Sequence, residues 1–338
     1  MPGTESNTVS VYFAPMEGLT DAVFRRVHHA LSGGADAYYL PFISPTQNLT
    51  LNGREKRNVM AENNAGVSCV PQVLTKEAEH FLWAARLFEE QGYNEVNLNA
   101  GCPSATVTAK GKGAGLLKNA DDLRRLLDGI CSASPLPVSV KTRIGFESAE
   151  EWDVLLSVYR DYPLKRLIVH PRSCREGYDP YFLHRECLTG SAIHSSGELI
   201  YNGDVFSAED AKNIQTEIPG LAGLMCGRGW VANPALGREI RGGEPLKKEE
   251  IILFHDTLAE EWQRIYQSDI VFMKLRVVMK HMACCFENIR KNEKSIRKTR
   301  NLKELLETDR RIFDTCGLRE NASFIPDEIL KEEEPSHS

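Results

Sequence analysis

The sequence of 338 residues contains no run that approaches 18 consecutive apolar residues, and its first ten residues, MPGTESNTVS, hold neither a basic nor an apolar segment. Its 9 cysteines are an odd number without a C-x-x-C pair, which fits neither a disulfide framework nor a structural zinc site. A net charge of −6 argues against a protein that coats nucleic acid with its whole surface. We therefore expect a cytoplasmic protein that binds neither a membrane nor a metal.

What remains is the composition of a globular chain, with 42% hydrophobic residues. Short apolar or β-branched runs recur along the first two thirds of the chain, and most are separated by stretches with helical periodicity. Eight such alternations predict an α/β fold of the (β/α)8 TIM-barrel type, because an open doubly wound sheet usually has fewer strands. The predicted strands are 9–15, 36–40, 68–74, 95–99, 137–141, 166–170, 198–202 and 221–226.

Polar residues gather where these predicted strands end. The carboxyl ends of barrel strands meet at one mouth, which carries the catalytic residues in this fold, and the loops after strands 7 and 8 commonly hold a phosphate. The sequence therefore predicts an active site at this mouth. Its candidate residues are Pro15, Met16, Glu17, Gln72, Asn97, Asn99, Lys141, His170, Asn202, Gly203, Asp204, Gly227, Arg228 and Gly229.

From about residue 248 the pattern changes to long helical stretches, at 249–266, 270–291 and around 302–313. We predict a barrel over 1–245, a small all-α domain over 246–330 and a disordered tail over 331–338. In the second stretch, Met273, Met279 and Met282 are expected to pack in the core. The all-α domain also carries a basic cluster in an otherwise acidic chain. This segregation predicts a polyanionic partner, and a solvated helix face is the alternative. The cluster comprises Arg290, Lys291, Lys294, Arg297, Lys298, Arg300 and Lys303, with the single acid Glu293 among them.

The segment N-L-N-A-G-C-P at 97–103, with the loop S-A-T-V-T-A-K-G-K-G-A-G after it, resembles the tRNA-dihydrouridine synthase family, in its FMN-dependent bacterial type. The similarity covers the whole barrel, in matching order. It implies an FMN cofactor, NADPH as electron donor, tRNA as substrate and a helical tRNA-binding domain; we expect a monomer. Further similar segments are A-P-M-E-G-L-T-D (14–21), P-Q-V (71–73), V-K-T-R-I-G (140–145), H-P-R-S (170–173) with Tyr178, Y-N-G-D-V (201–205) and C-G-R-G (226–229).

The implied reaction reduces the C5=C6 bond of uridine to 5,6-dihydrouridine, with hydride passing from N5 of reduced flavin to C6. Cys102 is expected to deliver the proton to C5, because a thiol is ordinarily protonated at neutral pH yet acidic enough to donate. The alternative for Cys102 is a buried structural thiol. Lys141 would stabilise the anionic reduced flavin, since an ammonium at the end of an apolar strand requires a neutralising anion; the alternative is a surface lysine.

The remaining expected roles follow from side-chain chemistry and from the resemblance. Gln72 would pair with the pyrimidine edge of the flavin, and His170 would contact the flavin or its phosphate unless it is a core histidine. The phosphate would lie on the backbone N–H groups of Gly203 and Gly227 and on Arg228, with Asp204 orienting the loop. Pro15, Met16, Glu17 and Asn202 complete the expected cofactor contacts.

For the substrate, Asn99 and Arg172 are expected to hold the uracil and a neighbouring phosphate. Lys110 and Lys112 lie in a glycine-rich segment that we interpret as a lid over the nucleotide, with a merely mobile loop as the alternative. The remaining expected tRNA contacts are Arg290, Lys294, Arg297 and Lys298.

Two segments depart from the family pattern. The predicted second strand reads Y-Y-L-P-F where many relatives have a Thr-Glu pair, which leaves its contribution to the pocket open, and Ser173 stands where threonine is commoner. Two other functions are considered. A flavin reductase of a free small molecule, similar to dihydroorotate dehydrogenases or old yellow enzymes, would need no basic helical domain, and an RNA-binding module on an inactive barrel would lack Cys102 or Lys141.

Overall fold

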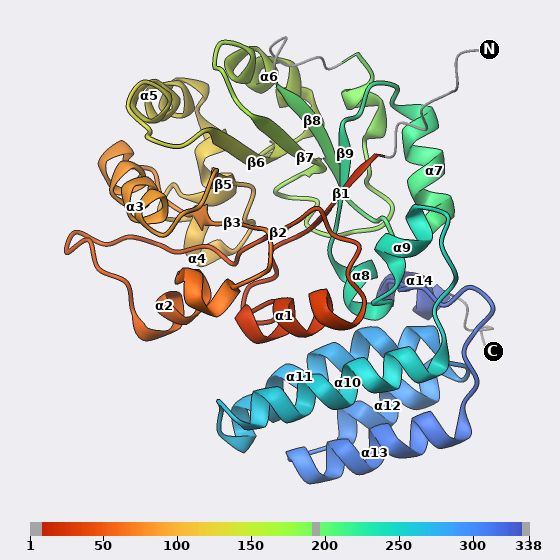
Figure 1. Cartoon of the computed structure of the whole chain (residues 1–338). Helices are drawn as coiled ribbons and strands as arrows, with labels where there is room; N and C mark the ends of the chain where they lie inside the picture. Colours follow the sequence, from red (N-terminus) through yellow and green to blue (C-terminus); the bar gives the residue numbers. More distant parts are fainter. Residues whose placement is uncertain (1–8, 191–196, 333–338) are drawn as a thin grey trace, which may run out of the picture.

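In the computed structural model, which describes residues 9–190 and 197–332, the strands form one parallel sheet in the order β3-β2-β1-β9-β8-β7-β6-β5-β4. Figure 1 shows them at the centre of the molecule, surrounded by helices. The (β/α)8 prediction is confirmed. The strands are β1 Ser10–Phe13, β2 Ala37–Tyr39, β3 Cys69–Val70, β4 Gln72–Val73, β5 Val96–Ala100, β6 Val138–Gly145, β7 Arg166–Ser173, β8 Glu198–Asn202 and β9 Gly223–Cys226.

The third predicted strand, 68–74, forms two short strands on either side of Pro71. Pro71 has no N–H for a sheet hydrogen bond, but its carbonyl accepts one from the backbone of Asn97 at 2.9 Å. β3 pairs with β2 and β4 pairs with β5, so these consecutive strands join the two ends of the sheet. The barrel is closed at this point.

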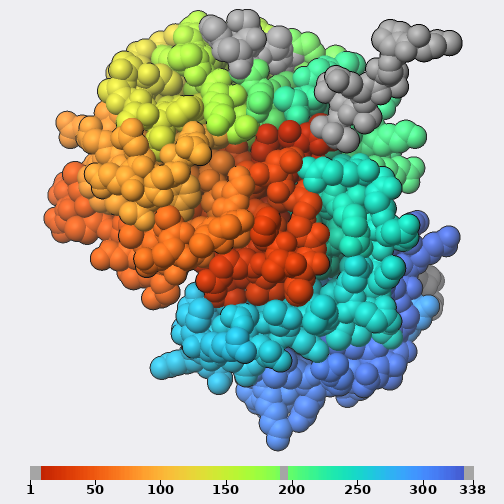
Figure 2. All heavy atoms as spheres, in the orientation of Figure 1, coloured from red at the N-terminus to blue at the C-terminus, as the bar shows by residue number. Residues whose placement is uncertain are grey.

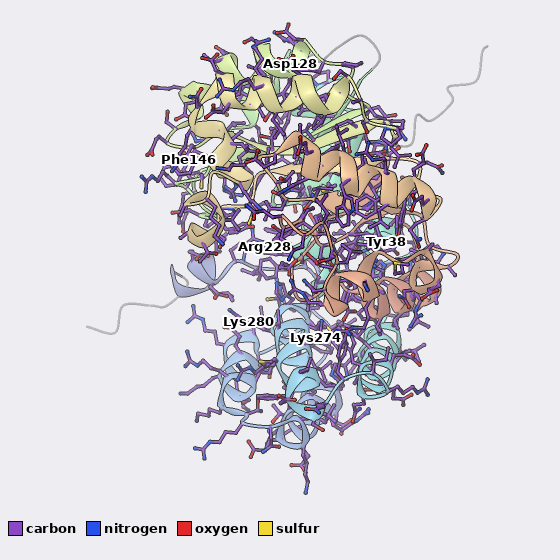
Figure 3. The ribbon with its side chains drawn as sticks, turned by 90° about the vertical axis from the view of Figure 1, so that its left-hand side faces the viewer. Tyr38, Asp128, Phe146, Arg228, Lys274 and Lys280 are labelled. Atoms are coloured by element: carbon purple, nitrogen blue, oxygen red, sulfur yellow. The ribbon has the colours of Figure 1, made fainter. Side chains whose placement is uncertain are left out.

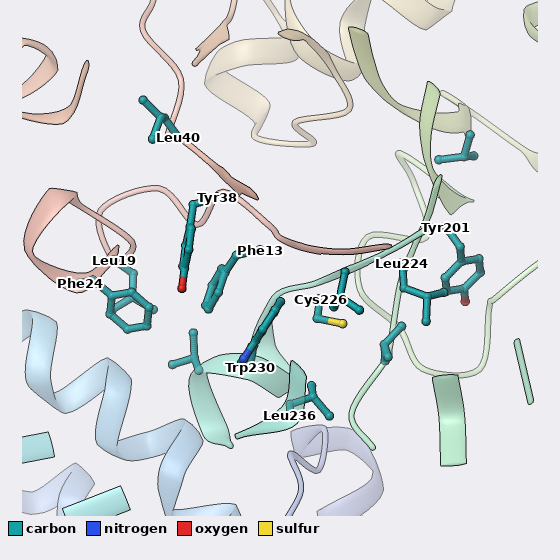
Figure 4. Packing of buried hydrophobic residues seen from close by; sticks show 14 of the residues in the cluster. Phe13, Leu19, Phe24, Tyr38, Leu40, Tyr201, Leu224, Cys226, Trp230 and Leu236 are labelled. Atoms are coloured by element: carbon teal, nitrogen blue, oxygen red, sulfur yellow. The ribbon is translucent and has the colours of Figure 1, made fainter. Parts of the chain in front are cut away.

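Side chains alternate between the barrel axis and the surrounding helices along each strand. In β1, Tyr12 belongs to the small cluster inside the barrel, whereas Phe13 belongs to the main core between strands and helices. There Phe13 stacks between Tyr38 and Trp230, at ring-centroid distances of 5.5 and 5.0 Å (Figure 4). The same alternation directs the polar residues of the strand ends into the mouth.

Four of the barrel helices begin at a short polar residue whose side chain caps them. Asn119 caps the helix that begins at Ala120 by accepting hydrogen bonds from two backbone N–H groups, and Ser207 forms a capping box with Asp210 in the helix that begins at Ala208. The helices over the barrel are α1 Ala22–Leu31, α2 Gly53–Val59, α3 Ala78–Glu90, α4 Ala105–Thr108, α5 Ala120–Cys131, α6 Trp152–Arg160, α7 Ala208–Glu217, α8 Arg228–Ala232 and α9 Leu236–Ile240, with 3-10 turns η1 Ala61–Asn64, η2 Gly113–Lys118, η3 Ala149–Glu151 and η4 Arg185–Leu188.

The C-terminal part consists of helices packed beside one another below the barrel in Figure 1. They are α10 Lys248–Gln263, α11 Ser268–Met282, η5 Ala283–Cys285, α12 Ile289–Lys298, α13 Leu302–Thr315 and α14 Asp327–Glu332. The predicted helix 270–291 is interrupted, because Asn288 adopts a left-handed backbone with φ 59° before α12 begins.

One expectation for this part was wrong. Met279 and Met282 are buried as predicted, but the side chain of Met273 lies on the outer face of α11 and is 55% exposed. The predicted disordered tail begins at 331, whereas α14 continues to Glu332. The rest of that tail, 333–338, lies outside the described residues.

Asp21 joins the barrel to the C-terminal helices. Its carboxylate caps α1 at the backbone N–H of Phe24, 3.0 Å away, and accepts hydrogen bonds from Trp262 Nε1 and Tyr266 Oη at 3.1 Å. Lys274 Nζ lies 2.9 Å from the same carboxylate. Figure 2 shows the resulting contact between the red N-terminal segment and the cyan helices. None of the helices that the structure describes is long and apolar enough to cross a membrane.

The Asp21 junction yields a stability prediction. Asp21→Ala should lower the free energy of unfolding by about 3 kcal/mol, because it removes a helix cap and leaves the largely buried Lys274 ammonium without its carboxylate. Denaturant titration of the full chain measures this change. The control is Asp161→Ala, which breaks an exposed ion pair with Arg124 and should cost much less. Equal losses in the two variants would contradict the role given to Asp21.

Candidate active site

A cavity of about 450 Å³ opens at the carboxyl ends of the strands. All eleven predicted cofactor contacts line it, together with Cys102 and Asn99, which come from one strand end and the turn after it. We call this cavity the barrel pocket. Its lining residues are Ala14, Pro15, Met16, Glu17, Pro41, Phe42, Gln72, Asn99, Gly101, Cys102, Pro103, Lys141, Arg143, His170, Tyr178, Asn202, Gly203, Asp204, Val205, Phe206, Met225, Gly227, Arg228 and His281.

The turn that carries Cys102 is held by hydrogen bonds on both sides. Asn99 Oδ1 accepts from the backbone N–H groups of Gly101 and Cys102, at 3.1 and 2.9 Å. The carbonyl of Cys102 in turn accepts from the backbone N–H of Ala114 at 3.0 Å. The thiol is therefore presented to the pocket by a fixed backbone.

The second half of the glycine-rich segment is packed against the Cys102 turn. Residues 113–117 are buried, and a Cβ added to Gly113 would lie 2.8 Å from the carbonyl of Cys102. The glycines thus permit close packing beneath the Cys102 turn. Lys110 is exposed and Lys112 is half-buried, with its Nζ 3.2 Å from Ser44 Oγ; neither lines the barrel pocket.

Amide side chains form a network across the floor of the pocket. Gln72 Nε2 donates to Asn97 Oδ1 at 2.7 Å, and Asn99 Nδ2 donates to Gln72 Oε1 at 2.8 Å. Asn97 Nδ2 continues the network to Ser139 Oγ at 2.8 Å. Because Asn99 Oδ1 accepts from two backbone N–H groups, its Nδ2 must face Gln72, and this sets the orientation of each following amide. The floor therefore presents a defined pattern of hydrogen-bond donors and acceptors.

Lys141 and Arg143 project into the pocket from alternate positions of β6. Arg143 is 1% exposed and donates to the carbonyls of Gly101, Ser173 and Gly177 at 2.8 to 3.0 Å, so it ties the Cys102 turn to the loop after β7. Lys141 forms no ion pair among the described residues. Burial, reinforced by the Arg143 guanidinium, lowers the pKa of Lys141 to about 7. An anion beside this ammonium would restore its charge.

His170 and Arg172 lie on the same face of β7, two positions apart. Arg172 Nη1 lies 3.0 Å from His170 Nε2, and since a guanidinium only donates, this imidazole nitrogen accepts. Burial, with the cations Arg143 and Lys141, holds the pKa of His170 well below its ordinary value. His170 is therefore neutral, with its proton on Nδ1.

The structure does not bring Arg172 to the pocket wall, where it was expected to hold substrate. Its side chain is fully buried and donates to the carbonyl of Asp179 at 2.8 Å and to Asp204 Oδ2 at 2.5 Å. Asp204 also receives Arg228 at 2.5 Å. Asp204 thus pairs with two arginines. Arg172 does not line the pocket but contacts two residues that do, Asp204 and His170.

Several pocket residues were missed in the sequence. Arg143 could have been found, because it follows Lys141 by two positions on a strand. Pro41 and Phe42 show that the atypical second strand contributes an apolar wall. Phe206 comes from the loop after β8, and His281 comes from α11 in the C-terminal part. No local pattern in the sequence marks His281.

A second cavity, of about 630 Å³, lies between α11, α12 and α14; we call it the helical groove. Lys294 and Arg297 are exposed along it, whereas Arg290 is half-buried and donates to the carbonyl of Leu330. Lys298 is exposed but does not line it. Its lining residues are Arg276, Val277, Lys280, Arg290, Glu293, Lys294, Ile296, Arg297, Asp327 and Leu330. Within the described part of the chain, no three His, Cys, Asp or Glu side chains gather in a way that could hold a metal ion.

One turn of α11 separates the two cavities. Val277 lines the helical groove and His281 lines the barrel pocket, and His281 Nδ1 lies 2.8 Å from the carbonyl of Val277. Residues four apart on a helix differ by about 6 Å along its axis. A bound chain could therefore span both cavities over a short distance.

The chain is similar in sequence to known proteins. The chain is 30% identical over 258 residues to a tRNA-dihydrouridine(16) synthase of Pseudomonas putida, covering 74% of this chain and 79% of that relative. It is 27% identical over 295 residues to tRNA-dihydrouridine synthase B of Pasteurella multocida, covering 83% and 85%.

The fold is also found in solved structures. The old yellow enzyme homologue of Zymomonas mobilis aligns with a TM-score of 0.50 at 11% identity, over 72% of this chain and 91% of that one, which supports the barrel alone. The model of the family described as dihydrouridine synthase (Dus) matches residues 12–315. This match spans the barrel and the C-terminal helices up to the end of α13, and the chain therefore belongs to the dihydrouridine synthase family.

Proposed function

We propose that this member of the family reduces the C5=C6 bond of uridine in tRNA, with FMN as its cofactor and NADPH as electron donor, as a cytoplasmic monomer. The observation that carries the proposal is the meeting of Cys102, Lys141 and a cationic corner at Arg228 in one pocket at the mouth of the barrel. A proton donor, a cation for a reduced ring and a phosphate site are the groups that this reaction requires.

The pocket residues fit a flavin monophosphate. A Cβ on Gly203 would lie 3.0 Å from the His170 ring, so only glycine leaves this corner open for a ligand beside His170. Arg228, held by Asp204, supplies a guanidinium suited to a phosphate. The amides of Gln72 and Asn99 offer donors and acceptors of the kind that a flavin or uracil edge requires.

When bound, flavin supplies the hydride for C6 of the uracil. Cys102 supplies the proton at C5 from its thiol, on the turn that Asn99 and Ala114 fix in place. The side-chain carbonyl of Asn99 accepts hydrogen bonds from that turn. We therefore assign Asn99 to positioning Cys102 as well as to binding substrate. Neutral His170 can donate from Nδ1 to the cofactor while Nε2 accepts from Arg172.

Lys141 supplies a positive charge that stabilises an anionic ring in the pocket. Its lowered pKa means that the ammonium is only partly populated near neutral pH in the empty pocket. A negative ligand beside it raises that pKa, so binding of the ligand is accompanied by proton uptake. Affinity for an anionic ring is therefore greatest below pH 7 and falls as pH rises above it.

The helical groove favours tRNA over a free small molecule as substrate. Four of its lining cations, at Arg276, Lys280, Lys294 and Arg297, face the two acids Glu293 and Asp327, which leaves it positively charged. A uridine must leave its stack to enter the barrel pocket, and phosphate contacts in the groove can offset that cost. Lys110 and Lys112, in the segment that follows the Cys102 turn, are proposed as further phosphate contacts.

The first of three predictions from the proposed function concerns Cys102. In cells that lack the gene, the wild-type protein should restore dihydrouridine in tRNA and Cys102→Ala should not, because the proton donor is lost. Mass spectrometry of tRNA nucleosides measures the product and, by position-resolved mapping, the uridine modified.

The purified Cys102→Ala protein should retain FMN and accept electrons from NADPH, while dihydrouridine formation falls at least about 100-fold. Cys131→Ala is the matched control, because this half-buried cysteine lies on α5 outside the pocket. Loss of both half-reactions in Cys102→Ala would show that Cys102 is not the proton donor.

The second prediction concerns Lys141. Lys141→Met should retain flavin but lower its two-electron midpoint potential by roughly 30 mV, because about 1.4 kcal/mol of stabilisation of the reduced anion is lost. Spectroelectrochemistry at pH 6 measures this potential, and the difference from wild type should shrink as pH rises above 7. Lys212→Met, an exposed substitution on α7, is the control. An unchanged potential in Lys141→Met would reject its role as counter-charge.

The third prediction concerns the helical groove. Lys294→Gln with Arg297→Gln should weaken tRNA binding and reduce the slope of log K against log salt by about 2, while FMN content stays constant. Binding titrations at several salt concentrations measure both quantities. The matched control removes the exposed charges of Arg86 and Lys212 on α3 and α7. The same salt slope in the two double variants would exclude the groove as a phosphate site.

A further inference from the structure

After α13 the chain turns back toward the barrel mouth; we call residues 317–332 the return segment. Its beginning pairs with the turn between α11 and α12, where the Glu287 N–H donates to the Gly317 carbonyl at 3.0 Å and the Arg319 N–H donates to the Cys285 carbonyl at 2.9 Å. Further along, Asn233 Nδ2, from the barrel, donates to the carbonyl of Ala322 at 3.1 Å. The return segment is thus fixed to both parts of the molecule.

Phe324 is the aromatic residue of this segment that packs against His281 and Phe206, two side chains that line the barrel pocket. Its ring stacks on His281, with centroids 5.1 Å apart and an interplanar angle of 24°, and meets Phe206 edge-on at 5.1 Å. Burial lowers the pKa of His281 to about 4, so the stacked imidazole is neutral at neutral pH. Beside these two rings, Phe324 faces the guanidinium of Arg228, whose Cζ lies 5.2 Å from its ring centroid.

Arg228 is held by aromatic rings from three separate parts of the chain. Besides Phe324, Tyr178 after β7 and Phe206 after β8 lie 5.3 and 5.4 Å from its Cζ. Asp204 pairs with one of its terminal nitrogens at 2.5 Å. Figure 3 shows Arg228 between the barrel and the C-terminal helices, above Lys280. An arginine with so many contacts retains little of its rotamer freedom.

We propose that Phe324 is a positioning residue, which fixes the Arg228 guanidinium for the cofactor phosphate. This inference rests on the proposed function, since it takes the ligand of Arg228 to be a flavin monophosphate. The match to the family ends at residue 315, so the return segment lies beyond it and supplies a contact that the matched residues do not contain.

The physical basis is pre-organisation. A guanidinium already aligned by ring faces and by Asp204 loses little freedom when a phosphate arrives, whereas a free one would have to be ordered on binding. Phe324 supplies a ring face that an aliphatic side chain of similar size cannot replace. The contribution should therefore depend on the ring and on the phosphate, and not on apolar volume alone.

The test compares FMN with riboflavin, which lacks the phosphate. The full-length chain, freed of flavin, is titrated with each compound and binding is followed by quenching of flavin fluorescence. Phe324→Leu should weaken FMN binding by about twofold to thirtyfold, the range that loss of one cation–π contact spans. Riboflavin binding should change by less than twofold, and Phe324→Tyr should bind FMN as wild type does.

Glu328→Gln is the matched control within the same segment. It removes an exposed charge that lines neither the barrel pocket nor the helical groove, so FMN affinity should stay constant. Thermal unfolding of each variant separates positioning from misfolding, because Phe324→Leu keeps the apolar contact with His281 and should unfold near the wild-type temperature.

The outcomes separate the two proposals. Equal loss of FMN and riboflavin affinity in Phe324→Leu, or no loss of either, would overturn the positioning role and leave the proposed function standing. A wild-type chain that binds riboflavin as tightly as FMN would instead overturn the phosphate site, and one that binds neither would overturn the flavin-dependent function.

Discussion

Closure of the barrel between β3 and β4 is the constraint on which the site depends. Pro71 divides one predicted strand into halves that pair with β2 and β5, so the sheet has no free edge at this point. In a closed parallel barrel every second side chain faces the axis and all strands end at the same mouth. Gln72, Asn99 and Lys141 therefore meet although they lie far apart in the sequence.

This mouth concentrates positive charge in a partly desolvated space. Lys141, Arg143 and Arg228 line it, and Asp204 is shared by Arg228 and the buried Arg172. Such an arrangement costs folding free energy when no anion is present, as the lowered pKa of Lys141 shows. The same positive charges that lower stability favour binding of a negatively charged ligand. The stability of the fold and the affinity of the site are thus opposed at Lys141.

Strand positions and the polar residues that end them could be predicted from the sequence, because the period of two and the polarity of the strand ends are local signals. Other features depend on contacts that no local pattern records. Glycines at 113 and 115 indicate mobility in the sequence but allow close packing in the structure. Arg172 has the charge expected of a substrate contact, but in the structure it is buried and pairs with Asp204. His281 lines the pocket, and Phe324 stacks on it, only because the C-terminal chain folds back on the barrel.

The shared helix α11 has a consequence for how such proteins can be recombined. Because residues of α11 line both cavities, the C-terminal helices cannot be exchanged without changing the barrel pocket. A chimera that joins this barrel to the helical part of a relative would exchange His281, and with it one wall of the barrel pocket. If the helical groove binds tRNA as proposed, substitutions in α11 that alter this binding would also alter the lining of the barrel pocket. In this architecture, changes in the two cavities are therefore coupled.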